Sequence, residues 1–157
     1  MLTVLTAVCI AWLMPAQDPN QTMNDRDAMV MGFDQDKTAH HFFLYEDGGA
    51  IDIAVKDPAD TKNRDAIRAH LPHIAMMFGN GDFDAPILVH DSKDVPGTSV
   101  LAEQKDKVVY RYHETALGGR VEIVTKDADA LAALHEFLAY QIKEHQTGDP
   151  ITVTKRK

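Results

Sequence analysis

The sequence predicts an α+β domain in which a four-stranded antiparallel sheet carries two helices on one face. The first observation behind this prediction is a repeat: Gly48 to Asp57 (GGAIDIAVKD) matches Gly118 to Asp127 (GGRVEIVTKD). The second is that an aromatic-rich strand pattern precedes each copy and an amphipathic helix pattern follows it. A long-period repeat of this kind indicates two copies of one supersecondary unit. We therefore expect a duplicated ββα unit.

Length and composition are those of one folded domain. The chain has 157 residues, of which 45% are hydrophobic and 25% charged, so it can bury a core and is not disordered throughout. Its net charge of −8 argues against nucleic acid as a partner, which requires a basic face. Cys9 is the sole cysteine, which excludes an internal disulfide and a CxxC pair. The basic end, Lys155-Arg156-Lys157, is expected to be a solvated tail.

Residues 1–16 are expected to be a signal peptide. They contain no charged residue, and Leu2 to Met14 is an apolar run of the length of a signal-peptide core. The run is shorter than the roughly 20 apolar residues that a transmembrane helix needs, so we expect no membrane insertion after cleavage. A periplasmic or secreted protein is therefore predicted. Because the segment lacks a positive start, translation from Met23, Met29 or Met31 is the alternative, with a cytoplasmic product.

The first repeat, residues 38–82, follows a polar, acidic stretch at 17–36 that we expect to be a flexible lead-in. His41 to Tyr45 predicts one strand, and the alternating pattern IDIAV of residues 51–55 predicts the next. The paired glycines between them are expected to supply the positive φ angles of a hairpin connection. Apolar residues then recur at helical spacing: Ile67, Leu71, Ile74 and Phe78.

The second repeat, residues 107–149, has the same layout, with strands expected near 108–113 and 121–125. Its helix carries an apolar stripe of Leu131, Leu134, Leu138 and Ile142. Repeats and insertion together are expected to form a single domain at 37–150, followed by a tail at 151–157.

An irregular insertion, residues 83–106, separates the two repeats. Ile87 to His90 predicts an edge strand that Pro86 starts, and Thr98 to Gln104 predicts a helical turn.

Histidines gather in and around residues 67–91, which makes this the candidate functional stretch. His70 and His73 lie three residues apart on a predicted helix, so they share a face, and Met77 extends that face by a turn. Imidazole with thioether suits copper, whereas imidazoles with a carboxylate suit zinc. His90 is a further candidate ligand, as is one of His40 and His41, since strand alternation turns only one of that pair toward the helices. Carboxylates that could accept hydrogen bonds from these rings are Asp82 and Asp91.

The two repeats differ at this site. His70 and His73 correspond to Phe137 and Tyr140, and Pro72 corresponds to an alanine. A proline inside a helix leaves a backbone carbonyl without its donor and kinks the axis. One copy has thus accepted a kink and two polar rings, which is the sequence argument for a site. The alternative is that the histidines sit at a core edge, bonded to backbone carbonyls.

A wider pattern runs through most of the chain. It comprises HHFxL at 40–44, the glycine pair at 48–49, HLxHIAxMF at 70–78, GDF at 81–83 and HD at 90–91. With this pattern the chain resembles a family of small, uncharacterised, exported bacterial proteins over about Met31 to Asp149. The resemblance implies no activity and no catalytic residues. It does imply that the domain proper begins near Met31.

The sequence therefore predicts an exported small binding protein that holds a transition metal, copper or zinc, through His70 and His73. The first alternative is an interaction module whose open sheet face pairs with itself, as a homodimer, or with a larger partner. The second is a small enzyme in which His70 or His73 acts as general base beside Asp82 or Asp91, although no catalytic motif supports it.

Overall fold

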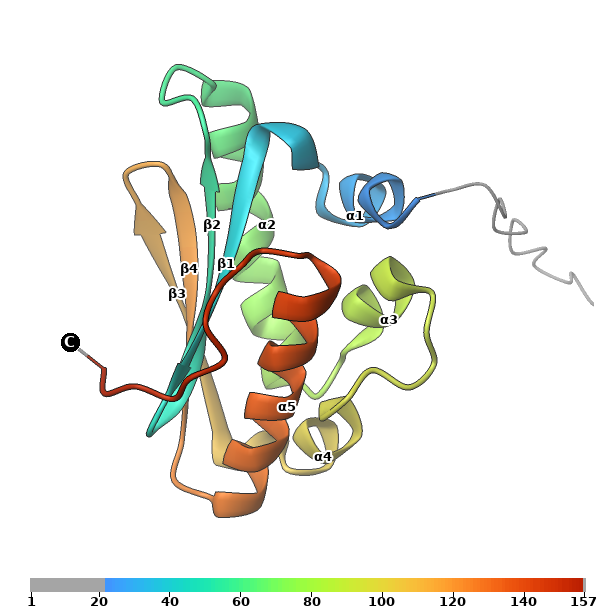
Figure 1. Ribbon diagram of the computed structural model, residues 1–157, viewed down its shortest axis with the longest axis vertical. Helices are drawn as coiled ribbons and strands as arrows, with labels where there is room; N and C mark the ends of the chain where they lie inside the picture. The colour runs from blue at the N-terminus through green and yellow to red at the C-terminus, as the bar shows by residue number, and fades with distance from the viewer. Residues whose placement is uncertain (1–21, 157) are drawn as a thin grey trace, which may run out of the picture.

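A computed structural model describes residues 22–156 and confirms the α+β class. Its core is one four-stranded antiparallel sheet in the order β1-β2-β4-β3 (Figure 1). The strands are β1 (Thr38–Tyr45), β2 (Gly48–Val55), β3 (Val108–Thr115) and β4 (Gly118–Thr125). Each hairpin therefore pairs its own two strands, and the hairpins meet through β2 and β4 at the centre.

Two long helices, α2 (Thr61–Gly79) and α5 (Ala128–Glu144), pack on one face of the sheet (Figure 1). Three short helices lie beyond them on the same side: α1 (Met23–Met31), α3 (Asp84–His90) and α4 (Thr98–Glu103). Short 3₁₀ turns, η1 (Gln35–Lys37) and η2 (Lys105–Lys107), lead into β1 and β3. Within the described residues, no helix is long and apolar enough to span a bilayer.

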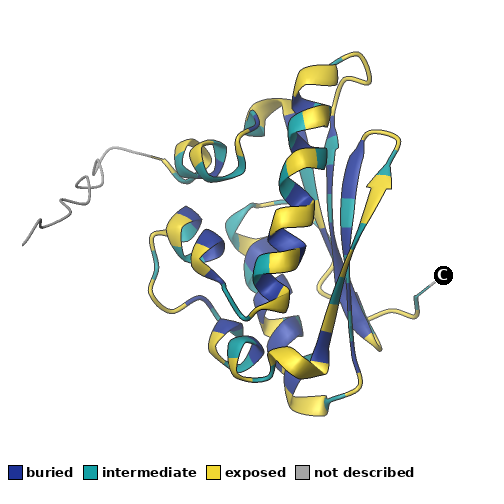
Figure 2. Cartoon of the chain, turned by 180° about the vertical axis from the view of Figure 1, so that it is seen from behind, coloured by how far each residue is buried: buried dark blue, intermediate teal, exposed yellow. Residues whose placement is uncertain are grey.

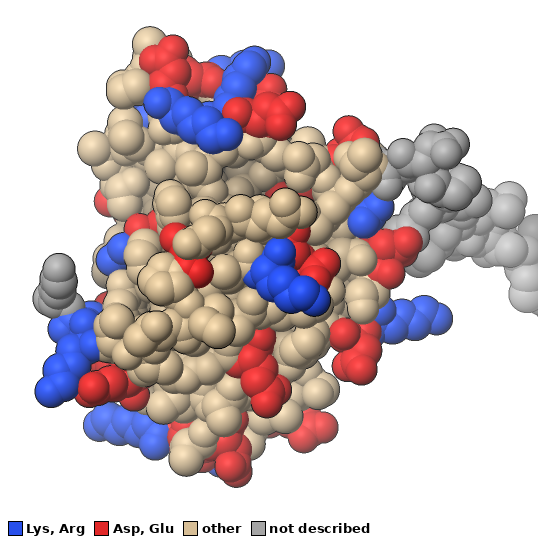
Figure 3. Space-filling model, viewed as in Figure 1, with Lys and Arg blue, Asp and Glu red and all other residues tan. Residues whose placement is uncertain are grey.

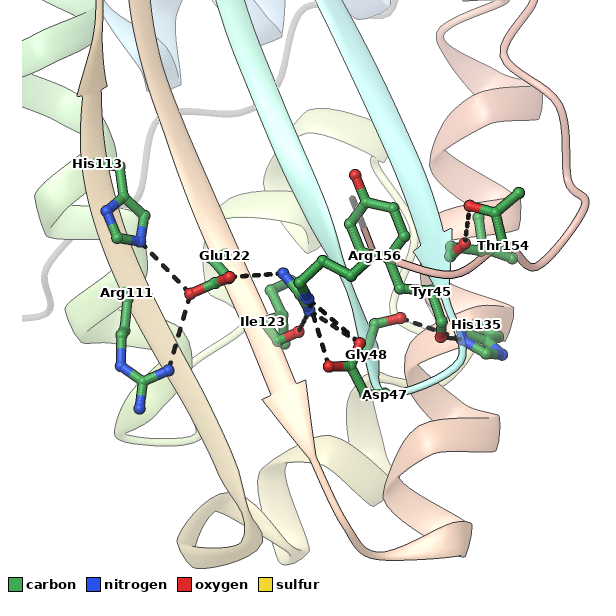
Figure 4. Close-up of polar contacts among 11 residues, drawn as sticks. Tyr45, Asp47, Gly48, Arg111, His113, Glu122, Ile123, His135, Thr154 and Arg156 are labelled. Carbon is green, nitrogen blue, oxygen red and sulfur yellow. Dashed lines mark hydrogen bonds and ion pairs between the residues drawn. The ribbon is translucent and has the colours of Figure 1, made fainter.

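The two repeats interlock. Helix α2 packs mainly on β3 and β4, whereas α5 packs mainly on β1 and β2, so each helix covers the hairpin of the other repeat. Equivalent side chains anchor the two arrangements. In α2, Arg68 Nη2 donates to Thr115 O at 2.7 Å, and in α5, His135 Nε2 lies 2.9 Å from Tyr45 O, as Figure 4 shows. These contacts confirm that the repeat in the sequence is a repeat in space.

The glycine pairs serve close packing, and only one of the four glycines, Gly48, has the positive φ that the sequence led us to expect, at 152°. The two residues that connect each hairpin precede the pair, and Gly48 and Gly118 already belong to β2 and β4. A Cβ on Gly48 would overlap the carbonyl of Ile123, and one on Gly118 would overlap that of Ile53. Only glycine lets the two central strands approach this closely.

The insertion is helical, so the edge strand predicted at Ile87 to His90 is wrong. That segment belongs to α3, in which Pro86 is the third residue, a position whose N–H has no partner inside the helix. Asp91 ends the helix in a left-handed conformation with φ of 48°. The helical turn predicted at Thr98 to Gln104 is confirmed as α4.

The lead-in also contains a helix that its polar composition concealed. Helix α1 begins with a capping box in which Thr22 and Asp25 satisfy each other's backbone N–H groups. Arg26 Nε donates to Val89 O at 2.9 Å and so ties α1 to α3. The signal peptide predicted at residues 1–16 and Cys9 lie outside the described residues.

The basic end of the chain is not simply a solvated tail. Thr154 pairs with Tyr45 at the edge of the sheet. Arg156 then crosses the outer sheet face to contact Glu122 and Asp47, and its guanidinium lies 4.7 Å from the Tyr45 ring centre (Figure 4). On the face shown in Figure 3, acidic and basic side chains are interspersed around a broad uncharged area.

Candidate functional site

The residues that the sequence nominated around His70 lie in different environments. His73 is exposed on α2, and His70 lies at the core edge with its ring centre 6.2 Å from that of Phe33. Met77 is partly buried against the hydrophobic core. Among residues 22–156, no three His, Cys, Asp or Glu side chains are placed so that they could already hold a metal ion together.

The two acidic candidates have local roles. Asp82 Oδ1 accepts a hydrogen bond from the Asp84 backbone N–H at 2.9 Å, at the start of α3. Asp91 is exposed where α3 ends. Among the described residues, no hydrogen bond joins either carboxylate to a histidine ring. The structure therefore does not show the support of the rings that the sequence led us to expect from Asp82 and Asp91.

The structure instead brings His40 and His90 together with His145. The ring centres of His40 and His145 are 5.4 Å apart, and those of His90 and His145 are 5.2 Å apart. Asp27 of α1 completes the group, with its Oδ2 at 3.8 Å from His145 Nδ1. We call these four residues the histidine cluster. They come from α1, β1 and the ends of α3 and α5, so only tertiary folding assembles them.

Local structure explains each position. Strand alternation turns only one of the neighbours His40 and His41 toward the helices, as expected, and the structure shows that it is His40. His90 is the last residue of α3, and His145 caps the C-terminus of α5. Asp27 is the one buried residue of α1, and its carboxylate lies beside His145 at the end of α5.

The three histidines of the cluster border an internal cavity of about 40 Å³. Most of the lining is apolar, including Met31, Phe42 and Phe137, and the polar groups His40, His90, Gln141 and His145 are the exceptions. A cavity needs roughly 10–15 Å³ to hold one water molecule, so this one has space for a single ion or a few waters.

In and beside the cluster, an unusual number of buried polar atoms have no hydrogen bonds from the described residues. They are both carboxylate oxygens of Asp27, His40 Nε2, His90 Nδ1 and Gln141 Nε2. The burial is real, because the Asp27 side chain is 1% exposed and that of His145 is 9% exposed. Buried polar groups are normally satisfied, so such a concentration points to a missing partner.

Burial also sets the protonation of the cluster. It lowers the pKa of His40 to about 4 and that of His145 to about 3, and it lowers the pKa of His90 as well. The same loss of solvation raises the pKa of Asp27 to about 7. The three imidazoles are therefore uncharged at neutral pH, and the contact between Asp27 and His145 is not a charged pair.

Sequence reasoning missed three members of this site. Asp27 lies in the stretch expected to be a flexible lead-in, and Gln141 lies within the second helix. His145 sits near a helix C-terminus, where the helix dipole alone accounts for a histidine. No spacing connects these residues to His40 and His90, which are 50 residues apart in the chain. Comparison with protein-family models, curated proteins and solved structures finds no match to the chain.

Proposed function

We propose that this protein is an exported small binding protein that holds a transition-metal ion, copper or zinc, in the histidine cluster. The observation that carries the proposal is the grouping of three uncharged, partly buried imidazoles around one cavity, with the buried carboxylate of Asp27 beside His145. The site thus keeps His40 and His90 of the sequence-based ligand set. It replaces His70 and His73 with His145 and Asp27.

A bound cation would supply a partner to buried donor atoms of the cluster. Each buried polar atom that lacks a hydrogen bond costs about 1–3 kcal/mol, and four such atoms that can bind a cation lie in this cluster: both Asp27 oxygens, His40 Nε2 and His90 Nδ1. A divalent ion would satisfy several of them at once. It would also stabilise the ionised form of Asp27, which burial otherwise disfavours.

His90 has the hydrogen bonding of a metal ligand. Its Nε2 lies 3.0 Å from Gln141 Oε1, and since that oxygen can only accept, Nε2 carries the proton. The lone pair is then on Nδ1, which is buried and without a hydrogen-bond partner among the described residues. Metal-bound histidines are held in this way, with the second ring nitrogen donating to an oxygen.

The spacing of the rings suits a shared ion. Two imidazoles on one tetrahedral zinc ion have ring centres about 5 Å apart, close to the 5.4 Å and 5.2 Å separations in the cluster. Since the donor atoms do not yet converge, binding requires side-chain rotations. The donors, three imidazoles and a carboxylate, suit zinc, and the Met31 thioether in the same cavity lining makes copper the alternative.

Titration of chelator-treated protein with zinc and copper tests the proposal by calorimetry and thermal melting. Wild-type protein should bind near one equivalent and melt higher in its presence, because an ion that binds only the folded state stabilises it. His90→Ala should lower the affinity by more than the roughly 10- to 100-fold that loss of a residue supporting a metal ligand costs, because it removes a ligand itself. His73→Ala is the matched control, since it removes an exposed histidine and should change nothing. Equal losses in both variants would contradict the proposal.

A module that pairs through its sheet face remains the second candidate. The outer face is partly occupied by the chain's own contacts, in which Arg120 pairs with Asp52 and lies over the Phe43 ring. Arg156 bridges Glu122 and Asp47 on the same face (Figure 4). Because these charges already have partners, this face would gain less free energy from dimer formation than an exposed apolar surface would. A dimer that forms regardless of chelator, measured by sedimentation, would favour this candidate.

A further inference from the structure

A surface hollow of about 290 Å³ lies next to the histidine cluster, where β1 begins and the chain leaves α5. Because β1 is an edge strand, the lining includes His41 from the outer side of the sheet and His40 and His145 of the cluster from the helix side. The hollow and the internal cavity therefore share two imidazoles. An ion arriving from solvent through this hollow would meet the cluster at those two rings.

His41 is held in a defined orientation at this hollow. Its Nδ1 lies 2.9 Å from Asp149 Oδ1. The other oxygen of Asp149 accepts hydrogen bonds from the Phe42 backbone N–H at 3.0 Å and the Thr147 hydroxyl at 2.7 Å. The Asp149 side chain is 11% exposed, whereas that of His41 is 47% exposed. A fixed carboxylate thus accepts a hydrogen bond from Nδ1–H and leaves Nε2 to bind an ion, as in carboxylate–histidine–metal arrangements.

We propose that His41 is a capture ligand, meaning the first group to bind the incoming ion, and that it passes the ion on to His40 and His145. The inference rests on the proposed function of the histidine cluster. Asp149 acts through His41 and is a positioning residue. The hollow also contains Asp36 and Lys56, whose opposite charges largely offset each other, so imidazole coordination and not net charge would recruit the ion.

Such a relay follows from the difference between the two places. His41 is half exposed, so an ion bound there keeps most of its water. Inside, several bare donor atoms can replace that water at once. A capture ligand of this kind lowers the barrier in both directions and does not contribute to the final complex. Its removal should therefore change rates and leave the equilibrium constant nearly unchanged.

Stopped-flow mixing with Co²⁺, followed by the visible absorption of the bound ion, separates rates from affinity in the full chain. His41→Ala should lower both the association and the dissociation rate by about tenfold, with Kd changed less than about twofold. Asp149→Asn should show a smaller loss of the same kind. It still accepts the Phe42 N–H but no longer offers a carboxylate to His41. The matched control is His113→Ala, which removes another half-exposed histidine beside a carboxylate, Glu122 at 3.4 Å.

The outcomes separate this inference from the proposed function. Unchanged rates in His41→Ala, in a protein whose Co²⁺ absorption is lost in His90→Ala, would overturn the capture role and leave the histidine cluster as the site. A rise in Kd as large as the fall in association rate would also overturn it, because His41 would then belong to the final complex. No Co²⁺ absorption in the wild type would overturn both.

Discussion

The two repeats share a chain path but differ in what covers their helices. Helix α5 is covered on its outer side by the insertion, where α4 packs on it and the His90 ring lies 5.0 Å from that of Tyr140. The outer face of α2 is exposed along much of its length (Figure 2). Met76 on that face is 55% exposed. The two halves thus differ because the insertion packs on α5 and leaves the outer face of α2 exposed, and not because their apolar helical spacing differs.

This difference gives the histidines of α2 another meaning. Phe137 in the second repeat is 2% exposed and packs against Phe78 and Phe83. Its counterpart His70 lies at the core edge beside Phe33, and His73 is exposed. Histidine in place of an aromatic residue marks a less deeply covered helix face. The difference between the repeats at these positions is therefore explained by burial and does not by itself indicate a ligand site.

The largest effect is expected at the centre of the sheet, where the halves are most alike. Gly48→Val and Gly118→Val each place a side chain against a backbone carbonyl of the neighbouring central strand. Each should lower the free energy of unfolding by about 3 kcal/mol or more, measured by urea denaturation. Val109→Ala, at a 45% exposed position on β3, is the control and should change it by less than about 0.5 kcal/mol. Unequal losses for the two glycines would show that the hairpins are not equivalent.

A middle-sized effect is expected at the anchors between each helix and the opposite hairpin. Arg68→Ala removes hydrogen bonds to Thr115 and Gly118 and should cost about 2 kcal/mol. His135→Ala removes the contacts to Tyr45 and Gly48 and should cost about 1 kcal/mol. Thermal melts of the two single variants and the double variant measure this. Since the anchors lie on different hairpins, the losses should add, and strong non-additivity would argue against two separate anchors.

The smallest effect is expected where the helices differ most. Burial, with the nearby His73, lowers the pKa of His70 to about 4 from its ordinary value of 6.5. The unfolded chain therefore binds more protons between these values, so His70 reduces stability as the pH falls from about 6.5 to 4. His70→Phe, the residue of the other repeat, should remove this loss, which we place at about 1 kcal/mol after allowance for partial exposure. Denaturation of both proteins at pH 7 and pH 5 measures it, and parallel pH profiles would contradict the prediction.

Most of the fold could be predicted because repeats and periodicity are local properties. The alternation in residues 51–55 and the glycine pairs placed both hairpins, and helical spacing placed α2 and α5. The strand prediction within the insertion was wrong because an apolar run such as residues 87–89 fits a strand or a buried helix equally well. Helix α1 was missed because capping and tertiary contact, not amphipathic pattern, account for it.

The candidate site was half predicted for a related reason. His40 and His90 were nominated because histidines are conspicuous, and strand alternation indicated correctly that only one of His40 and His41 faces the helices. Asp27 and His145 were not, since their significance depends on loss of solvent and on neighbours distant in the chain.

By itself the sequence determined the class of the fold, the repeat and which residue types were available for chemistry. These follow from the spacing of apolar side chains and from the residue composition, both of which can be read within each segment of the chain. Only the tertiary structure decided which histidines meet and which are solvated. Packing of α1 and α3 beside the start of β1 and the end of α5 removes water from three imidazoles and a carboxylate. That burial changes their pKa values and leaves their donor atoms without partners, and no local pattern encodes it.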